Sequence, residues 1–225
     1  MSTCDEDEWI VGVSKGGDAL DFYDVVMKRR SVRSFAPTTL PADAVDRVLD
    51  AAKMAPSQMN MQPWRFLVLE GQARDRLCSV VSASTRLLKD TFPFIGPEAL
   101  ETAARFLSDL GGAPLVVVVT YPRSTSEYDL KVTLLAVGGA VMLLQSAAAA
   151  EGMGSVCITC AEWVEEAIRR DLGFEDERLA AIVPIGYPLG DQGEQPPREE
   201  KSVRLSTWPQ TKVESSLATR APGLG

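Results

Sequence analysis

The 225-residue sequence contains no histidine. Its absence excludes Ser-His-Asp and Cys-His catalysis, the HExxH zinc motif and nearly every catalytic zinc site. If the protein is an enzyme, carboxylates, lysine, tyrosine or cysteine carry out proton transfer, or a cofactor supplies the chemistry. No metal ligands are predicted.

Positive charge is also scarce, with 23 Lys and Arg against 31 Asp and Glu and a formal net charge of -8. General binding to DNA or RNA needs a broad basic face that displaces counterions. A nucleic-acid partner is therefore not expected, although a few clustered arginines suffice for one small phosphate.

Cysteine is rare, and Cys4, Cys78, Cys157 and Cys160 are too scattered for a disulfide scaffold. The CxxC pair at 157 and 160 lies in an apolar, strand-like run and not at a helix start, which disfavours a redox role.

The acidic run at residues 5–8 is unlike a signal peptide. A reducing cytoplasm is the expected location.

The length suits one sizeable domain with a full hydrophobic core. We predict a flexible acidic tail at residues 1–19, a folded domain at 20–205 and a C-terminal tail at 206–225. Helical periodicity at 42–55, 72–110 and 161–171 alternates with apolar strand-like runs at 65–69, 114–121, 156–159 and 181–187. This alternation indicates an α/β or α+β sheet domain with helices on its faces, and the runs at 65–69 and 114–121 are predicted to be buried.

The segment 132–150 is nearly continuous in apolar and small residues and approaches the length of a membrane span. Gln145 and Ser146 interrupt it, and no cluster of Lys and Arg flanks it. We therefore predict no membrane association, but a helix buried in the core and in part at a dimer interface.

Residues 28–35, Lys-Arg-Arg-Ser-Val-Arg-Ser-Phe, hold four of the 23 basic side chains beside two hydroxyls. We call this segment the basic octet. Guanidinium groups suit phosphate oxygens because they donate two parallel charge-assisted hydrogen bonds. The alternative is that these are solvated cations favoured at the C-terminal end of a helix. The octet alone leaves both interpretations open.

Residues 56–64, which we call the amide loop, read Pro-Ser-Gln-Met-Asn-Met-Gln-Pro-Trp and lead directly into the strand predicted at 65–69. A polar loop on a rigid scaffold is a candidate for ligand contacts. It is equally compatible with a plain connection between a helix and a strand.

Four motifs, taken in order over about residues 22–205, resemble the FMN-dependent nitroreductase superfamily. They are Arg29-Arg30-Ser31-Val32-Arg33, Pro56-Ser57 with Asn60-x-Gln62-Pro63-Trp64, Glu151-Gly152-Met153-Gly154-Ser155, and Gly186-Tyr187-Pro188 followed by a basic tail. The resemblance implies an α+β fold with a mixed central sheet flanked by helices, in an intertwined homodimer with two FMN sites at the interface. It also implies an enzyme in which NADH or NADPH reduces FMN by hydride transfer, after which a small electron-poor acceptor such as a nitroaromatic or quinone is reduced.

The resemblance also implies roles for individual residues. Arg29 and Ser31 would bind the phosphate and ribityl end of FMN, while Arg33 would approach the pyrimidine side of the ring. A permanent cation there favours reduced flavin, which carries negative charge near N1 and C2=O. For Arg30, a surface salt bridge is the alternative. The partner subunit would supply Ser57, Asn60 and Gln62.

The strand start at Cys157, Ile158 and Thr159 would lie against the ring, with Thr159 the candidate partner of N5. Arg198 is the candidate C-terminal phosphate contact, ahead of Lys201. The predicted catalytic residues are Arg33 and Thr159, and the predicted cofactor-binding residues are Arg29, Arg30, Ser31, Val32, Arg33, Pro56, Ser57, Asn60, Gln62, Cys157, Ile158, Thr159 and Arg198.

Two other functions stay open. The first is reductive dehalogenation of an iodotyrosine-like substrate, but that branch grips its substrate with a lid containing Glu, Tyr and Lys, and residues 79–110 contain Lys89, Glu98 and Glu101 without a tyrosine. The second is a non-catalytic flavin-binding module. The benzimidazole-forming branch is disfavoured because it has an acidic residue where this chain has Ser31.

Overall fold

The computed structural model describes residues 21–83, 85, 96–159, 162–174, 176–190 and 197–198. The chain divides into two units, Met1–Gly193 and Glu194–Gly225, and every helix and strand below belongs to the first. The tails predicted at 1–19 and 206–225 lie outside the described residues, so the boundaries at 20 and 205 stay predictions.

The centre of the first unit is a four-stranded sheet in the order β1-β2-β4-β3, with every neighbouring pair antiparallel. Its strands are β1 (Arg65–Glu70), β2 (Leu115–Pro122), β3 (Gly154–Ser155) and β4 (Glu177–Gly186). The one parallel pairing among the described residues is the bridge between Ser31 and Ser155. The four strands thus form an antiparallel sheet, and the parallel pairing expected of a mixed sheet is limited to this bridge with the basic octet.

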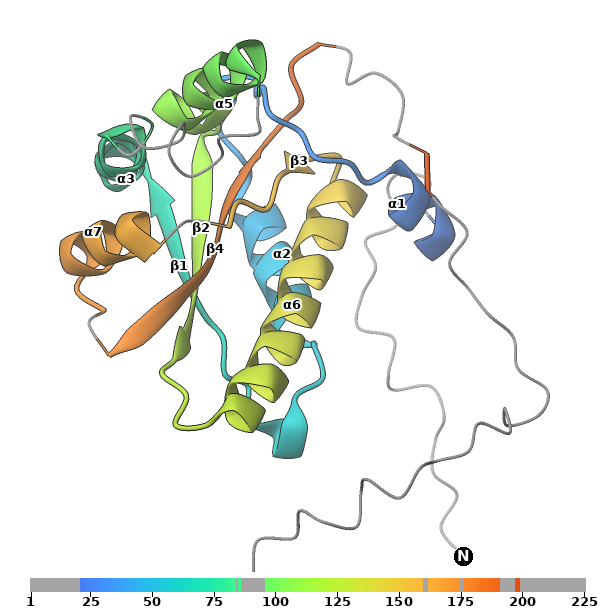
Figure 1. Ribbon diagram of the computed structural model, residues 1–225. Coiled ribbons are helices and arrows are strands. Elements are labelled where there is room, and N and C mark those ends of the chain that lie inside the picture. Colours follow the sequence, from blue (N-terminus) through green and yellow to red (C-terminus); the bar gives the residue numbers. More distant parts are fainter. Residues whose placement is uncertain are drawn as a thin grey trace, which may run out of the picture. The chain divides into compact units, whose positions relative to one another are not determined.

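Helices cover both faces of this sheet (Figure 1). Helices α2 and α6 pack on one face, in a core that includes Val48 and Leu144, while α3 and α7 pack on the other, in a core that includes Leu77 and Ile168. The predicted α+β fold is confirmed. The helices are α1 (Phe22–Lys28), α2 (Ala42–Lys53), α3 (Gly71–Ala83), α5 (Pro97–Asp109), α6 (Glu127–Ala150) and α7 (Glu162–Leu172), with the 3-10 turns η1 (Gln58–Asn60) and η3 (Leu110–Gly112).

Burial differs between the strands that were predicted to be buried. In β2 every residue but the last is buried, as predicted, because β1 and β4 flank it and helices cover both its faces. Strand β1 is an edge strand, and its Val68 is 39% exposed. The prediction of a buried strand at 65–69 was wrong because an edge strand has a neighbour on one side only.

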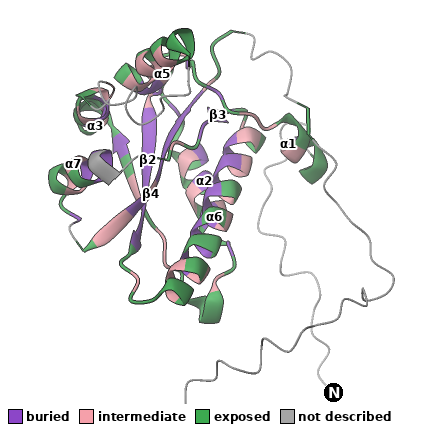
Figure 2. Cartoon of the chain, viewed as in Figure 1, coloured by how far each residue is buried: buried purple, intermediate pink, exposed green. Residues whose placement is uncertain are grey.

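Helix α6 begins five residues earlier than predicted, where Ser126 accepts a hydrogen bond from the Asp129 N–H at 3.1 Å and caps it. By length and composition α6 is apolar enough to cross a membrane, but 44% of its most apolar stretch is buried inside the protein. Figure 2 shows the buried side of α6 toward the sheet and exposed residues on the other side. Four of the exposed residues are large and mainly apolar: Tyr128, Leu134, Leu135 and Met142.

The strand predicted at 156–159 was wrong, because β3 comprises only Gly154 and Ser155. Further along, contact with β4 continues through a hydrogen bond from the Val156 N–H to the Pro184 carbonyl at 3.4 Å and through the isolated bridge between Ile158 and Ile182. Glycine is required at 154 because a Cβ there would lie 2.5 Å from Cγ2 of Val32. The close approach of the octet thus decides where this strand forms.

A buried acid supports the sheet beside an irregularity in the β2–β4 register between Val119 and Thr120. Glu165 of α7 is 6% exposed and accepts hydrogen bonds from Arg178 Nε at 2.6 Å and from the Leu179 N–H at 3.1 Å. Its carboxylate therefore ties α7 to β4.

Replacement of Glu165 by alanine is expected to lower the free energy of unfolding by about 2 kcal/mol, because the Arg178 guanidinium and the Leu179 N–H lose their acceptor. The loss is moderated because the Arg178 side chain is 34% exposed. Urea denaturation followed by circular dichroism measures it. Glu166→Ala is the matched control, since Glu166 lies next in sequence and pairs with Arg170 on the surface, where the expected change is below about 0.5 kcal/mol. Equal losses in the two variants would contradict a supporting role for Glu165.

Candidate cofactor site

The basic octet is held in place by backbone pairing with β3. Helix α1 ends at Lys28, and the Arg29 N–H donates to the Val25 carbonyl at 2.8 Å. The chain then runs beside β3, where the Val32 N–H donates to the Ser155 carbonyl at 3.0 Å. Val32 is 3% exposed, whereas Ser31 and Arg33 are exposed. Extended backbone alternates its side chains, so the octet presents two different faces.

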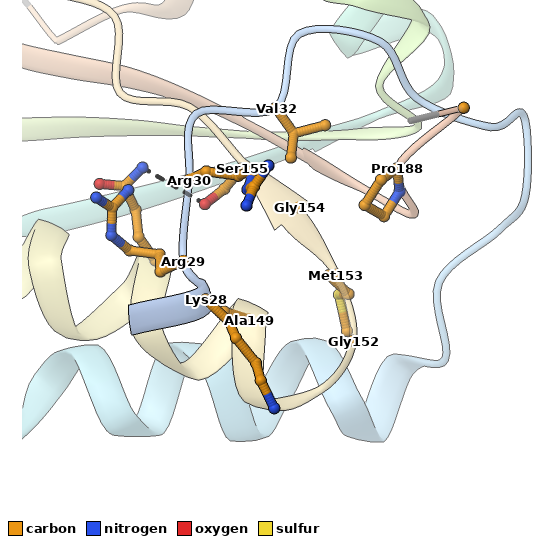
Figure 3. Close-up of a pocket in the computed structure, with 12 residues that line it drawn as sticks. Lys28, Arg29, Arg30, Val32, Ala149, Gly152, Met153, Gly154, Ser155 and Pro188 are labelled. Atoms are coloured by element: carbon orange, nitrogen blue, oxygen red, sulfur yellow. Dashed lines mark hydrogen bonds between the residues drawn. The ribbon is translucent and has the colours of Figure 1, made fainter. Parts of the chain in front are cut away.

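One face of the octet borders a pocket of about 350 Å³ between the end of α1, the C-terminal half of α6 and β3 (Figure 3). This volume lies in the range of small-molecule sites. In Figure 3 the Arg29 and Lys28 side chains extend in different directions from the end of α1. The lining residues are Lys28, Arg29, Arg30, Val32, Gln145, Ala149, Gly152, Met153, Gly154, Ser155, Pro188 and Gly190.

The charged lining of this pocket consists of Lys28, Arg29 and Arg30, and no carboxylate belongs to the described lining. Gln145 is buried, and its Nε2 donates to Ser155 Oγ at 3.4 Å. The Ser155 hydroxyl accepts that bond and keeps its own proton to donate to a ligand. Such a set of donors fits a phosphate group, so the pocket favours the anion-site interpretation of the octet.

The turn that closes the pocket is anchored by an ion pair. Arg47 of α2 donates from Nε and Nη2 to the two carboxylate oxygens of Glu151, at 2.7 and 2.8 Å. Hydrogen bonding to Arg47 lowers the pKa of Glu151, and the same hydrogen bond raises the pKa of Arg47. Both groups stay charged at neutral pH and hold the end of α6 against α2, next to the turn at Gly152.

The residues predicted to contact the ribityl chain and the ring lie outside this pocket, except for Val32. Ser31, Arg33, Cys157 and Thr159 are exposed and do not belong to the pocket lining. Arg33 Nη1 donates to the Ser31 carbonyl at 3.5 Å. Ile158 differs from them, because it packs partly buried against the core beneath α7. The two residues predicted for the phosphate and ribityl end are thus divided: Arg29 lines the pocket, together with Arg30, whereas Ser31 is exposed outside it.

The amide loop holds an unusual backbone. Asn60 and Gln62 both have positive φ, at 56° and 46°, where most side chains are disfavoured. Ser57 Oγ accepts from the Gln62 N–H at 2.9 Å, and Gln62 Nε2 donates to Asn60 Oδ1 at 3.2 Å. Local hydrogen bonds therefore hold this strained loop in shape, and strain of this kind clusters at ligand sites.

Within one chain the amide loop does not reach the pocket. Ser57 lies against the N-terminal half of α6, beside Asp129 and Thr133. Gln145 borders the pocket sixteen residues further along the same helix than Asp129. At 1.5 Å per residue this is about 24 Å. The structure therefore does not bring Pro56, Ser57, Asn60 and Gln62 together with the octet in a single subunit.

Other predicted contacts cannot be located relative to the pocket. Arg198 belongs to the second unit, and Lys201 lies outside the described residues. The choice between them stays a prediction.

Sequence reasoning missed three polar lining residues: Lys28, Gln145 and Ser155. Gln145 carried a signal, since it is a polar residue in an otherwise apolar helix. Lys28 was counted only as part of the basic cluster, and Ser155 only as part of the Gly-Met-Gly-Ser motif.

Comparison with known proteins places the chain in a family. The model of the Nitroreductase family matches residues 26–187. An iodotyrosine deiodinase from Thermotoga neapolitana is 29% identical over 193 residues, covering 83% of this chain and 98% of the relative. Nitroreductase NfnB from Mycolicibacterium smegmatis is 26% identical over 194 residues, covering 72% of this chain and 81% of the relative.

Solved structures agree in fold. An iodotyrosine deiodinase bound to FMN and 3-iodo-L-tyrosine matches with a TM-score of 0.65 and 29% identity, covering 84% of this chain and all of the other. NfnB from Mycobacterium smegmatis in complex with NADPH has a TM-score of 0.62 at 22% identity, covering 74% of this chain and 86% of the other. The chain belongs to the nitroreductase family of oxidoreductases.

Proposed function

We propose that the protein is an FMN-dependent oxidoreductase in which NADH or NADPH supplies electrons for reduction of a nitroaromatic, quinone or similar electron-poor acceptor. One observation carries the proposal: the pocket is lined by three cations and no described carboxylate, while Arg33 and Thr159 are exposed outside it. The first feature suits a phosphate, and the second leaves room for a planar ring beside it.

The residues of this chain would bind and orient the cofactor. Arg29 and Arg30 hold the phosphate end from the pocket, and the Ser155 hydroxyl donates to it, while Ser31 contacts the ribityl end from outside the pocket. Arg33 places a permanent cation at the pyrimidine side of the ring, and Thr159 donates a hydrogen bond near N5. When bound, FMN supplies the hydride chemistry, so no histidine is needed.

A second copy of the chain would complete each site. The amide loop lies about 24 Å along α6 from the pocket, so a partner subunit is needed for Asn60 and Ser57 to reach the cofactor. Large apolar side chains stay exposed on α1 and α6, among them Tyr23, Met27 and Leu135 at 73%, 70% and 79%. Exposed apolar surface of this kind marks protein interfaces. The homodimer is therefore part of the proposal.

The expected location also stays a proposal. Cys78 and Cys157 are free thiols among the described residues. Free thiols are compatible with the reducing cytoplasm.

Reductive dehalogenation is the second candidate. It is supported by the 29% identity to an iodotyrosine deiodinase of which the chain covers 98%. Against it stands the lack of a tyrosine at residues 79–110, where the lid of that branch would grip its substrate. A halogenated phenol therefore belongs among the acceptors to be tested.

The purified protein is expected to show flavin absorbance bands and to be bleached by NADH or NADPH under anaerobic conditions. Addition of menadione or nitrobenzene should restore the oxidised spectrum, whereas release of iodide from 3-iodo-L-tyrosine would favour the dehalogenase. A yellow protein that is inert with every acceptor would indicate a flavin-binding module. Colourless protein that gains no flavin absorbance on addition of FMN would refute the proposal.

A further inference from the structure

A second hollow lies beside Arg33, on the side of helix α5. It has a volume of about 530 Å³ and is lined by Arg33, Glu98, Ala99, Thr102, Ala103 and Phe106. Apart from Arg33, every lining residue comes from α5. The hollow therefore combines the exposed Arg33 of the octet with one face of a single helix.

Backbone contacts fix the octet against the end of α5. The Phe35 N–H donates to the Gly111 carbonyl at 2.9 Å, directly after α5. Gly111 has φ of 69°, and a Cβ at this position would overlap the carbonyl oxygen of Arg33. Because the two backbones touch here, the position of Arg33 relative to α5 is set by the fold and not by the arginine side chain.

The helical spacing gives the hollow two kinds of wall. Ala99, Ala103 and Phe106 follow an i, i+4, i+7 pattern, which places them on one apolar stripe. Two of these side chains are methyl groups, so the stripe leaves space for a flat ring that stacks toward Phe106. No residue of α5 is fully buried, and the stripe is accessible to a ligand.

Beside this stripe, Glu98 and Thr102 lie one turn apart and offer acceptor oxygens. The Thr102 hydroxyl donates to the Glu98 backbone carbonyl at 2.9 Å, so the hydroxyl oxygen keeps lone pairs for a ligand. Both residues are exposed. A ligand that enters the hollow therefore meets hydrogen-bond acceptors and a negative charge on the helix side.

Among the described residues that line the hollow, Arg33 and Glu98 are the charged ones. If Arg33 serves the cofactor ring, as the proposed function has it, the remaining charge that faces a second ligand is the Glu98 carboxylate. The nearby Glu101 and Arg105 pair with each other at 3.1 Å on the surface. A purely local role for Glu98 is favourable interaction with the helix dipole, which predicts no effect on ligand choice.

We propose that Glu98 determines acceptor specificity: the hollow takes flat aromatic or quinoid acceptors that are neutral or cationic, and rejects those that carry a carboxylate. This inference rests on the proposed function, because it assigns Arg33 to the cofactor. The apolar stripe binds the ring of the acceptor, and Glu98 discriminates by the charge of its substituent.

Binding to the oxidised holoprotein tests the proposal without turnover. Benzyltrimethylammonium, benzyl alcohol and benzoate are titrated while the flavin absorbance bands are followed. One exposed charge pair is worth up to about fivefold in affinity, and attraction of the cation and repulsion of the anion combine. The wild-type protein is therefore expected to bind the ammonium probe about tenfold more tightly than benzoate, with the alcohol in between.

Two substitutions and a control isolate the carboxylate. Glu98→Gln is expected to remove the tenfold preference and Glu98→Lys to reverse it. Glu101→Gln, one turn along the same helix, removes an equal charge outside the hollow and should leave the preference unchanged. The same order is expected for oxidation of the dithionite-reduced holoprotein by nitrobenzenes carrying trimethylammonium or carboxylate groups, measured by stopped flow.

The outcomes separate the two proposals. Probe affinities that do not respond to Glu98→Gln, or tighter binding of benzoate in the wild type, would overturn the role of Glu98 while leaving the flavoenzyme intact. A protein that retains no FMN would overturn the proposed function and this inference with it.

Discussion

Arg29→Ala is expected to raise the dissociation constant for FMN about 10- to 100-fold. A hydrogen bond to a charged group contributes about 1.5–3 kcal/mol, and each 1.4 kcal/mol is a factor of ten in affinity. Arg29 is half-buried and lines the pocket that we assign to the phosphate. Quenching of FMN fluorescence during titration of the apoprotein measures the change. Arg29→Lys should recover part of the affinity, because an ammonium keeps the charge but loses the planar fork.

Arg33→Ala is expected to behave differently, since Arg33 is exposed outside that pocket. FMN should stay bound, while the rate of flavin reduction by NADH or NADPH falls, because the cation that favours reduced flavin is lost. Arg170→Ala is the control for loss of a guanidinium, as Arg170 pairs with Glu166 on the exposed side of α7. Identical effects of Arg29→Ala and Arg33→Ala on binding and reduction would contradict the separation of their roles.

Mixing two variants, at an FMN concentration at which neither is active alone, is expected to restore activity if each site is built from two chains. Arg29→Ala removes the phosphate contact, and Asn60→Gly removes the amide while keeping the positive φ of 56° that glycine tolerates. In a symmetric dimer the mixed species has one intact site and one doubly altered site. Unfolding and refolding the variants together at equal concentration should therefore give about a quarter of the wild-type activity, because half of the dimers are mixed.

Purified mixed dimers, selected by two different affinity tags, should reach about half of the wild-type activity. The control is to refold each variant alone, which should give no recovery. If Asn60 instead served the site of its own chain, every site in the mixture would carry one defect. Absence of recovery in a dimer of normal size would therefore contradict a composite site.

Several features of the fold follow from local pattern. The amphipathic helix at 42–55 and the apolar run at 114–121 appear as α2 and β2 because periodicity and composition are properties of a short segment. Errors arose where a distant segment decides the outcome. The strand expected at 156–159 forms instead at Gly154–Ser155, because Val32 packs against Gly154 and the octet pairs with Ser155.

The candidate site shows the same division. Its basic residues could be predicted from the sequence, since four basic side chains within eight residues of an acidic protein indicate a site for a bound anion. Gln145 stands out in the sequence as a polar residue in an apolar helix, but its place in the same pocket could not be predicted. More than one hundred residues separate it from the octet, and only the packing of α6 brings it to Ser155. Glu98 is a comparable case, as its relation to Arg33 depends on the contact between the octet and Gly111.

By itself the sequence determined that this protein has no histidine chemistry, carries a cluster of cations suited to a phosphate, and folds as helices around a buried strand. Only the tertiary structure decided which cations share a pocket. Arg29 joins the pocket from the end of α1, where it caps the helix. An extended segment sends alternate side chains to opposite sides, and its register against β3 placed Arg30 and Val32 at the pocket while Ser31 and Arg33 face outward. That register is set by hydrogen bonds to a strand far along the sequence, so it cannot be predicted from the octet alone.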